Sequence, residues 1–295
     1  MSSRNHQIRR GARTGVLLAF TGPALAVLVL TRLAPEGLSL FASFEKVDPF
    51  DGDSWSFVGW ANFRRLFTSA AFWHVLGVTM WFVVLASPVI VVGSLYLAWL
   101  YTRTMPMRGL WRTVAFLPSA IPSLGLTVMW GVALKPTGVV NKTLEAIGLP
   151  AQGFYSSAAQ ALPTIALITA WGGVGYWMVF LIAGLLDIPR EILDAARVDG
   201  ATPWREFRSV VLPLLRRPLL FVLVANTVWV FQIYAPIQVL TNGGPLEATS
   251  TLMFDTVRTA TVYSNQQQAM AQMVVLLVLL GTTVAVQFAL LGERE

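Results

Sequence analysis

Cysteine is absent from this sequence of 295 residues, and charged residues are scarce, at 12% of the chain. The absence of cysteine excludes disulfides, thiolate metal sites and cysteine nucleophiles. Only two histidines occur, His6 and His74, and their separation argues against a histidine-based metal cluster. Soluble domains carry roughly 25% charged residues. Half that share, together with 55% hydrophobic residues, excludes a disordered chain and argues against a water-solvated fold.

The charges gather between long apolar stretches, which is typical of an all-α membrane protein with several spans. A helix needs about 20 apolar residues to cross the roughly 30 Å of hydrocarbon in a bilayer. This criterion predicts six transmembrane helices, of which the first begins near Gly15 and the others cover about 72–100, 110–134, 162–186, 219–240 and 269–291. We therefore expect one membrane domain over 1–295, with its core at 70–292.

Arginine and lysine are unevenly distributed among the loops, and positive residues accumulate in cytoplasmic loops. Of the 21 basic residues, fourteen lie before the first span, after spans two and four, or in the C-terminal tail. These segments, both termini and the tail 1–13 among them, are therefore expected to be cytoplasmic. Because the net charge of +6 is explained by this topology, nucleic acid is not an expected partner, whereas the lipid bilayer is.

The loop between the fourth and fifth spans, residues 187–218, is too polar to cross the membrane and too regular to be irregular coil. An apolar stripe at 192–196 predicts a helix, and Gly200 ends it. Thr202 followed by Pro203 is typical of the start of a second helix. The loop, which we call the 187–218 hairpin, either docks on another protein or rests on the lipid headgroups.

The residues of the 187–218 hairpin resemble the EAA motif of the membrane subunits of binding-protein-dependent ABC importers. The motif's positions are matched, with the same spacing throughout, by Asp194, Ala195, Ala196, Gly200, Val210, Leu212 and Pro213. The chain departs from the motif in two conservative places, Asp for Glu at 194 and Val for Ile at 210. The segments WANFRRLF, RTVAFLPSAIPSLGLTVMW and VLTNGGP are similar to the sugar-importer branch, especially to the first of its two permeases.

The resemblance implies a role for the 187–218 hairpin. In that family the hairpin supplies a coupling helix to an ATP-binding subunit dimer, whose closure rocks two permeases between inward-facing and outward-facing states. The residues that the resemblance assigns to this contact are Asp194, Ala195, Ala196, Gly200, Leu212 and Pro213. Without the resemblance, Asp194 would be a member of a solvated salt bridge with Arg190 or Arg197.

The resemblance also implies the partner subunits, the membrane and the cofactors of the complex. It predicts a second homologous permease subunit, a dimer of ATP-binding subunits and an extracytoplasmic solute-binding protein, assembled in the bacterial cytoplasmic (inner) membrane. ATP and magnesium would be bound by the partner ATPase, and no cofactor is expected in this chain.

Polar and aromatic residues in spans four and five mark a candidate substrate pathway, together with two glycines that let a flat ligand or a neighbouring helix approach the backbone. They are Trp171, Gly172, Gly173, Tyr176, Asn226, Trp229 and Gln232. Aromatic planes stack on sugar rings and amides reach hydroxyls, which suits a neutral polyol, but such residues also serve packing between helices. The resemblance implies that a sugar lies between these two spans. The absence of basic residues at mid-depth disfavours free phosphate, while sugars and glycerol-phosphate derivatives stay open.

Two other function classes compete with an ATP-driven importer. A secondary transporter or channel commonly needs acidic residues inside the membrane, and spans two to six have none. An enzyme needs a nucleophile–base pair or metal ligands, which these spans lack, and the chain has no Gly-Lys-Ser/Thr phosphate loop. The prediction is a non-enzymatic permease subunit that moves a sugar or related polyol, with a secondary transporter or channel as the alternative.

Overall fold

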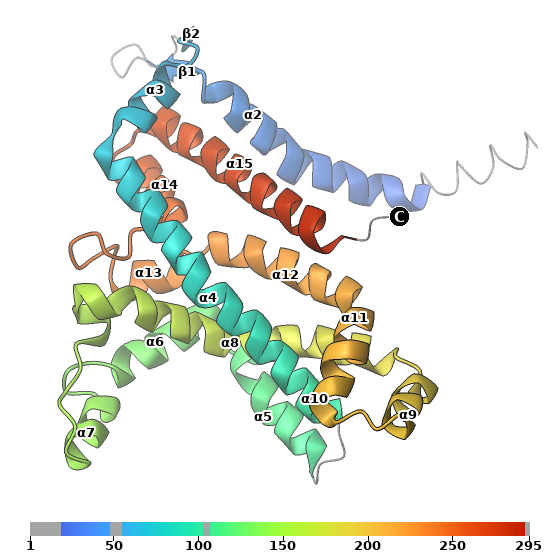
Figure 1. Ribbon diagram of the computed structural model, residues 1–295. Helices are drawn as coiled ribbons and strands as arrows, with labels where there is room; N and C mark the ends of the chain where they lie inside the picture. Colours follow the sequence, from blue (N-terminus) through green and yellow to red (C-terminus); the bar gives the residue numbers. More distant parts are fainter. Residues whose placement is uncertain (1–18, 48–54, 103–106, 293–295) are drawn as a thin grey trace, which may run out of the picture.

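The structure is a computed structural model that describes residues 19–47, 55–102 and 107–292. The tail 1–13 and the expected start of the first span near Gly15 lie outside these residues. The described part is almost entirely helical (Figure 1), so the predicted all-α class is confirmed. It adds two short strands, β1 (Glu45–Val47) and β2 (Trp55–Phe57), which pair antiparallel.

Five helices in the described ranges are long and apolar enough to cross a bilayer, and a bent pair forms a sixth span. The five are Ala19–Ala42, α4 (Ala70–Thr102), α8 (Ala158–Leu186), Arg216–Leu240 and α15 (Gln266–Leu291). Ala19–Ala42 includes the π-helical turn η1 (Val29–Leu33) and α2 (Ala34–Ala42), and Arg216–Leu240 comprises α12 (Arg216–Phe231) and α13 (Ala235–Leu240). The bent pair is α5 (Arg108–Ala120) and α6 (Ser123–Ala133). The six predicted spans therefore each have a counterpart.

Shorter helices connect the spans. They are α3 (Ala61–Thr68), α7 (Val139–Ala146), η2 (Phe154–Ser156), α9 (Arg190–Val198), α10 (Pro203–Glu206), η3 (Phe207–Val211), α11 (Leu212–Leu214) and α14 (Leu252–Thr261).

The third predicted span is not one continuous helix. α5 ends at Ala120 and α6 begins at Ser123, with a bend of 93° between them. Ile121 is extended (φ −80°, ψ 129°), because the residue before a proline is disfavoured in the helical region. Pro122 has no N–H with which to continue the helix. The continuous helix predicted for 110–134 is therefore wrong at this point.

α4 lies at the centre of the helix bundle and crosses the molecule from α3 to the neighbourhood of α10 (Figure 1). Three buried side chains on it, Thr79, Ser87 and Ser94, form hydrogen bonds to α14, α12 and α8 at 2.8, 2.6 and 2.9 Å, respectively. Small polar residues of this kind let helices approach closely and link them inside a membrane. α4 is therefore tied to three different parts of the fold.

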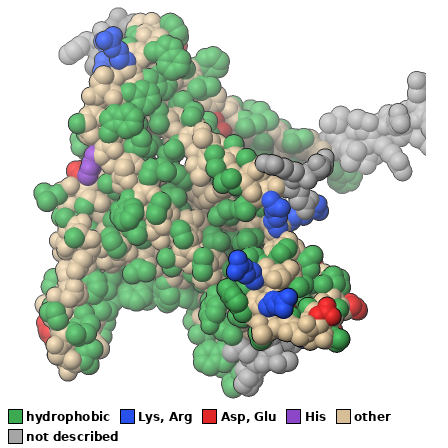
Figure 2. Space-filling model, viewed as in Figure 1, with side chains coloured by type: hydrophobic (Ala, Val, Ile, Leu, Met, Phe, Trp, Pro, Cys, Tyr) green, Lys and Arg blue, Asp and Glu red, His purple; other side chains and the backbone are tan. Residues whose placement is uncertain are grey.

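The first helix and α15 lie at the edge of the bundle. In Ala19–Ala42, none of the most apolar stretch is buried within the chain. In α15, only 6% of the corresponding stretch is buried. Figure 2 shows hydrophobic side chains spread over the visible face, with Lys and Arg at the upper left and in the lower right part. The far end of α15 is held by Arg216, whose guanidinium donates to the carbonyl oxygens of Leu291 and Gly292.

Gly175 allows α5 to lie directly against α8, since a Cβ at this position would collide with the backbone carbonyl oxygen of Ala115. We expect Gly175→Val to force the two helices apart, because overpacking costs about 1–3 kcal/mol. Gly77→Val on α4 is the matched control, as a Cβ at Gly77 meets nothing within 4 Å. The melting temperature of the purified protein should fall for Gly175→Val only, and equal values for the two variants would contradict this packing.

Candidate functional site

A cavity of about 520 Å³ lies where the break between α5 and α6 meets α8 and α12–α13. Small-molecule sites typically have about 300–1,000 Å³. The cavity is lined by Pro118, Ser119, Ala120, Ile121, Pro122, Ser123, Leu126, Thr127, Ile168, Thr169, Gly172, Gly173, Tyr176, Trp177, Trp229, Ile233 and Pro236. None of these described lining residues is Asp, Glu, Lys, Arg or His, so the wall carries no formal charge.

Two hydroxyl groups in the cavity wall have no hydrogen-bond partner among the described residues: Thr169 Oγ1 on α8 and Ser119 Oγ on α5. Thr169 is only 4% exposed. A buried hydroxyl without a partner costs about 1–3 kcal/mol. α6 also begins in this wall at Ser123, and the first N–H groups of a helix have no partner within the helix. The wall therefore offers several polar groups to a hydroxylated ligand.

Aromatic side chains and glycines form the side of the cavity along α8. Tyr176 and Trp177 pack edge to face, with ring centroids 4.9 Å apart. A Cβ at Gly173 would lie 3.2 Å from the ring of Trp229, and the absence of a side chain at Gly172 admits a side chain of α6. The two glycines, expected to admit either a ligand or a neighbouring helix, are thus covered by side chains from α12 and α6.

Three of the seven residues predicted for the substrate pathway do not line the cavity. Asn226 is fully buried, and its Nδ2 donates to Ser87 Oγ at 2.6 Å, so it links α12 to α4. Trp171 packs edge to face on Trp130, with ring centroids 5.3 Å apart. Gln232 is exposed at the end of α12. Asn226 does not line the cavity, because the face of α12 that carries it packs against α4.

The part of the cavity wall that comes from the third span and from Thr169 was not predicted from the sequence. Ser119 and Ser123 reach the cavity because the chain breaks between them. Thr169 precedes Gly172, Gly173 and Tyr176 by three, four and seven residues, which is the spacing of one helix face. This spacing was the available signal for Thr169, whereas nothing in the length criterion indicated the break.

The 187–218 segment folds as the predicted helical hairpin. α9 ends in a turn where Gly200 has φ +78°, a left-handed conformation that glycine adopts without steric cost. Thr202 caps α10, as its Oγ1 accepts a hydrogen bond from the N–H of Arg205 at 3.4 Å. The widened turn η3 directly precedes α11, in which Pro213 lacks the N–H that a regular helix would use.

The motif residues are mostly accessible. The side chain of Asp194 is 67% exposed and its carboxylate lies 3.1 Å from Arg197 Nη1, so the salt bridge expected on the solvated helix is present. Ala195 and Gly200 are exposed and Ala196 is half-buried. Of the two motif residues near the end of the hairpin, Leu212 is half-buried and Pro213 is exposed. Most side chains of α9 are therefore exposed and accessible to a partner.

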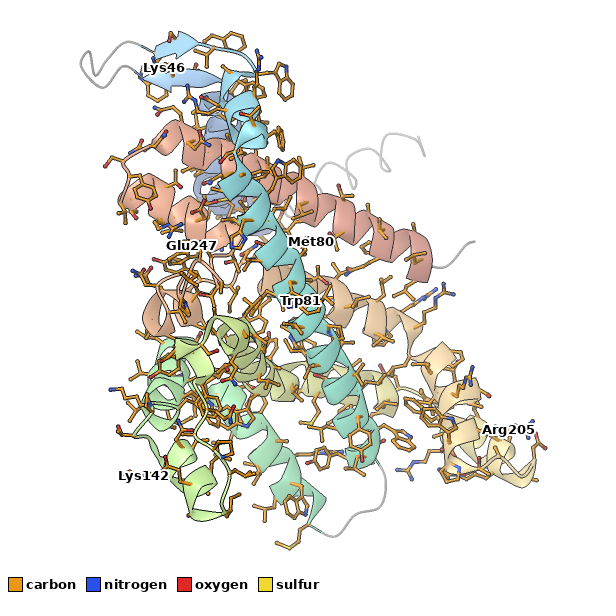
Figure 3. All side chains as sticks on the ribbon, turned by 60° about the vertical axis from the view of Figure 1, so that its left-hand side comes forward. Lys46, Met80, Trp81, Lys142, Arg205 and Glu247 are labelled. Carbon is orange, nitrogen blue, oxygen red and sulfur yellow. The ribbon has the colours of Figure 1, made fainter. Side chains whose placement is uncertain are left out.

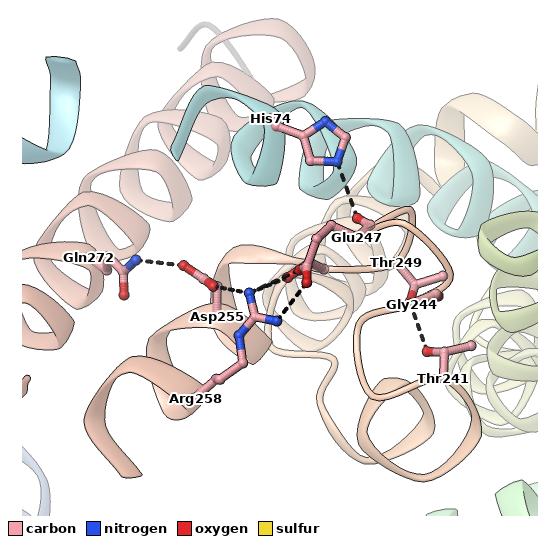
Figure 4. Close-up of polar contacts among 9 residues, drawn as sticks. His74, Thr241, Gly244, Glu247, Thr249, Asp255, Arg258 and Gln272 are labelled. Atoms are coloured by element: carbon pink, nitrogen blue, oxygen red, sulfur yellow. Dashed lines mark hydrogen bonds and ion pairs between the residues drawn. The ribbon is translucent and has the colours of Figure 1, made fainter. Parts of the chain in front are cut away.

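On the opposite side of the molecule from Arg205 (Figure 3), an ion-pair network holds the loop between α13 and α14. Nη2 of Arg258, on α14, lies 2.9 Å from Oε2 of Glu247 and 2.7 Å from Oδ1 of Asp255 (Figure 4). His74 Nε2 lies 3.2 Å from the backbone oxygen of Glu247. Hydrogen bonds from the Arg258 guanidinium hold the pKa of the Glu247 carboxyl below its usual value.

Residues 92–294 match the model of one protein family, the binding-protein-dependent transport system inner membrane component. The match covers more than half of the chain and includes the cavity and the 187–218 hairpin. The chain belongs to this family. It is therefore an inner-membrane permease component, and the resemblance inferred from the hairpin motif is confirmed.

Curated relatives of the permease cover nearly its whole length. The sn-glycerol-3-phosphate transport system permease protein UgpA of Yersinia pestis is 31% identical over 274 residues, which is 92% of this chain and 92% of that protein. The probable ABC transporter permease protein YesP of Bacillus subtilis is 30% identical over 275 residues, 92% of this chain and 88% of that protein.

Solved structures share the fold of the permease. A chain of a bacterial alginate ABC transporter, crystallised with an alginate pentasaccharide-bound periplasmic protein, superposes with a TM-score of 0.82 at 20% identity, covering 95% of this chain and 94% of that one. A second structure of a bacterial ABC transporter for alginate import has a TM-score of 0.78 at 20% identity, with 97% and 98% covered. At this identity, the likeness concerns the fold.

The loop between α13 and α14 should loosen in acid. Because the folded pKa of Glu247 is lowered, its stabilising contribution is complete above about pH 4.5, its ordinary value, and is lost as the pH falls through the folded pKa. A spin label on Leu246→Cys, the only cysteine in the chain, should become more mobile between pH 7 and pH values below 4. With Glu247→Gln added, the label should already be mobile at pH 7, and equal mobility of both proteins at pH 7 would refute the assignment.

Proposed function

We propose that this permease is one of two membrane subunits of an ATP-driven importer for a sugar or related polyol. The observation that carries the proposal is the cavity at the break between α5 and α6, whose uncharged wall combines aromatic rings with unpartnered hydroxyls. The names of the relatives, a glycerol-phosphate permease and alginate transporters, support a solute of this class.

In this proposal, the solute's hydroxyls form hydrogen bonds with Thr169 and Ser119, and its apolar ring faces pack on Tyr176 and Trp229. An uncharged solute suits the wall best, because a phosphate group would lose its hydration without a countercharge in the cavity. A glycerol-phosphate derivative would need that countercharge from another subunit.

The 187–218 hairpin is the proposed contact to a dimer of ATP-binding subunits, with the exposed residues Asp194, Ala195 and Gly200 nearest to it. The hairpin and both termini are then cytoplasmic, and an extracytoplasmic solute-binding protein delivers the solute from the other side. ATP and magnesium belong to the partner ATPase, and this chain supplies neither cofactor nor catalysis. A second homologous permease subunit completes the membrane part of the complex. A secondary transporter or channel would work without these partners.

Removing one hydroxyl of the cavity wall tests the solute site. Thr169→Val conserves the shape and deletes one hydrogen bond, so we expect the maximal uptake rate in proteoliposomes of the full complex to fall about 2- to 10-fold. Thr164→Val is the matched control, since Thr164 is buried on the same helix outside the cavity. Equal uptake by both variants would place the solute elsewhere.

The class of solute is tested with the same proteoliposomes. A panel of neutral mono-, di- and oligosaccharides, glycerol 3-phosphate and its diesters is offered to the wild-type complex with its solute-binding protein. Uptake of a neutral sugar or polyol is the expected result. Uptake restricted to phosphorylated solutes would show that another subunit completes the site with positive charge.

Gly200→Asp should abolish the coupling of ATP hydrolysis to uptake without unfolding the chain. A Cβ at Gly200 meets nothing within 4 Å, and Asp tolerates a left-handed backbone better than most residues, so the added carboxylate acts mainly on whatever docks there. Gly148→Asp is the matched control, because Gly148 also has a positive φ (+80°) and open space, in the connection after α7. Near-normal uptake by Gly200→Asp would remove the docking assignment.

A further inference from the structure

Glu206, the last residue of α10, is the only Asp, Glu, Lys or Arg among the residues with described side chains that is buried, at 6% exposed. It lies in the 187–218 hairpin rather than in a membrane span. Burial of a carboxylate is costly unless an opposite charge and hydrogen bonds compensate it. The position of Glu206 therefore calls for a partner, and the structure supplies one.

The partner is Arg197, in the last turn of α9. Its Nε lies 2.9 Å from Glu206 Oε2, and its Nη2 lies 3.4 Å from Oε1, so the guanidinium contacts both carboxylate oxygens. The same guanidinium reaches Asp194 through Nη1 at 3.1 Å. The two contacts differ in setting: Asp194 is exposed and lies on α9 itself, whereas Glu206 is buried and lies on the other arm of the hairpin.

α9 has few other connections to the bundle. It contains no buried residue. The side chain of Leu193 is partly buried and packs against the main hydrophobic core. The second arm of the hairpin, in contrast, is embedded: Phe207 and Val211 are buried in the main hydrophobic core. Phe207 also packs on Trp99 of α4, with ring centroids 5.0 Å apart. Arg197 thus joins the exposed helix to a segment that belongs to the bundle.

We propose that the Arg197–Glu206 ion pair is the positioning contact that makes α9 move as one body with the membrane helices. The inference rests on the proposed function, because it takes the force to come from an ATPase dimer docked on α9. The displacement passes from α9 through the ion pair to Glu206 and Phe207, and from Phe207 to Trp99 on α4. α4 is in turn bonded to α8 and α12, which line the cavity. Arg197 and Glu206 act through these contacts and touch no solute.

Breaking the pair should uncouple the two activities while the ATPase still docks. The variants are Glu206→Gln, which keeps the shape of the side chain, Arg197→Gln, and the two combined, each in the full complex with its solute-binding protein. The readout is the amount of solute imported per ATP hydrolysed in proteoliposomes, a ratio that a mere loss of folded protein leaves unchanged. Mutations in a coupling path typically change coupling by about 2- to 30-fold, and we expect each single variant to lower the ratio within that range.

The double variant and a control separate a specific pair from a general loss of charge. If the two residues act as a unit, the double variant lowers the ratio no further than the worse single variant. Arg205→Gln, a change at an exposed position of α10 next to Glu206, should leave the ratio at the wild-type value. A wild-type ratio for Glu206→Gln, or an equal fall for Arg205→Gln, would overturn the proposal.

A cross-link tests whether the contact between residues 197 and 206 couples ATP hydrolysis to import, even where a Gln variant fails to accumulate in the membrane. The chain has no cysteine of its own, so Arg197→Cys with Glu206→Cys provides a unique pair, in a complex whose other subunits lack accessible cysteines. Bridging the pair with a short bis-maleimide should restore the ratio relative to the unbridged protein, and failure to restore it would overturn the proposal. If the wild-type complex instead showed no ATP-dependent uptake, the proposed function itself would fail, an outcome distinct from failure of the ion pair.

Discussion

Every backbone N–H and C=O group inside a bilayer needs a partner from the protein, because hydrocarbon offers none. This constraint explains why the described membrane spans are helical, and it restricts where a helix can break. The break at Ile121 and Pro122 lies beside the cavity, against α8, where polar groups have neighbours other than lipid. An interrupted helix in a membrane and a solute-sized cavity thus follow from one requirement, and α8, α12 and α13 complete the cavity wall.

The spans and the 187–218 hairpin could be predicted from the sequence, because both depend on local patterns. Long apolar runs decide which segments cross the membrane, and Gly200 and Thr202 mark a turn and a cap by their own chemistry. The break in the third span was not predicted, since a criterion that averages over about 20 residues does not register two extended residues. The direction of Asn226 was not predicted either, because it depends on α4, more than a hundred residues away, offering Ser87 as a partner.

α4 connects the two regions to which function is assigned. Near one end, Trp99 contacts the hairpin through Phe207, and in its middle Ser87 and Ser94 bond to the helices that line the cavity. Near the other end, Thr79 accepts a hydrogen bond from α14, the helix that carries Arg258. A single helix of 33 residues therefore has contacts with the hairpin, the cavity helices and the loop network, which is the geometry needed to relate them mechanically.

The first helix and α15 give the surrounding bilayer a part in the tertiary structure. Lipid tails are as apolar as leucine, so no hydrophobic driving force holds these two helices against the bundle. α15 is bonded to its neighbours through Gln272, which donates to Asp255, and Gln287, which donates to Thr227, and both helices cross the membrane, which restricts them to sideways movement within it. In a detergent micelle that lateral confinement is lost, and the order in which helices separate is then set by the polar bonds between them. The bonds that hold α15, from Arg216 of α12 to its end and from its own Gln272 and Gln287 to α14 and α12, together with the bonds along α4, therefore indicate how native a solubilised sample is.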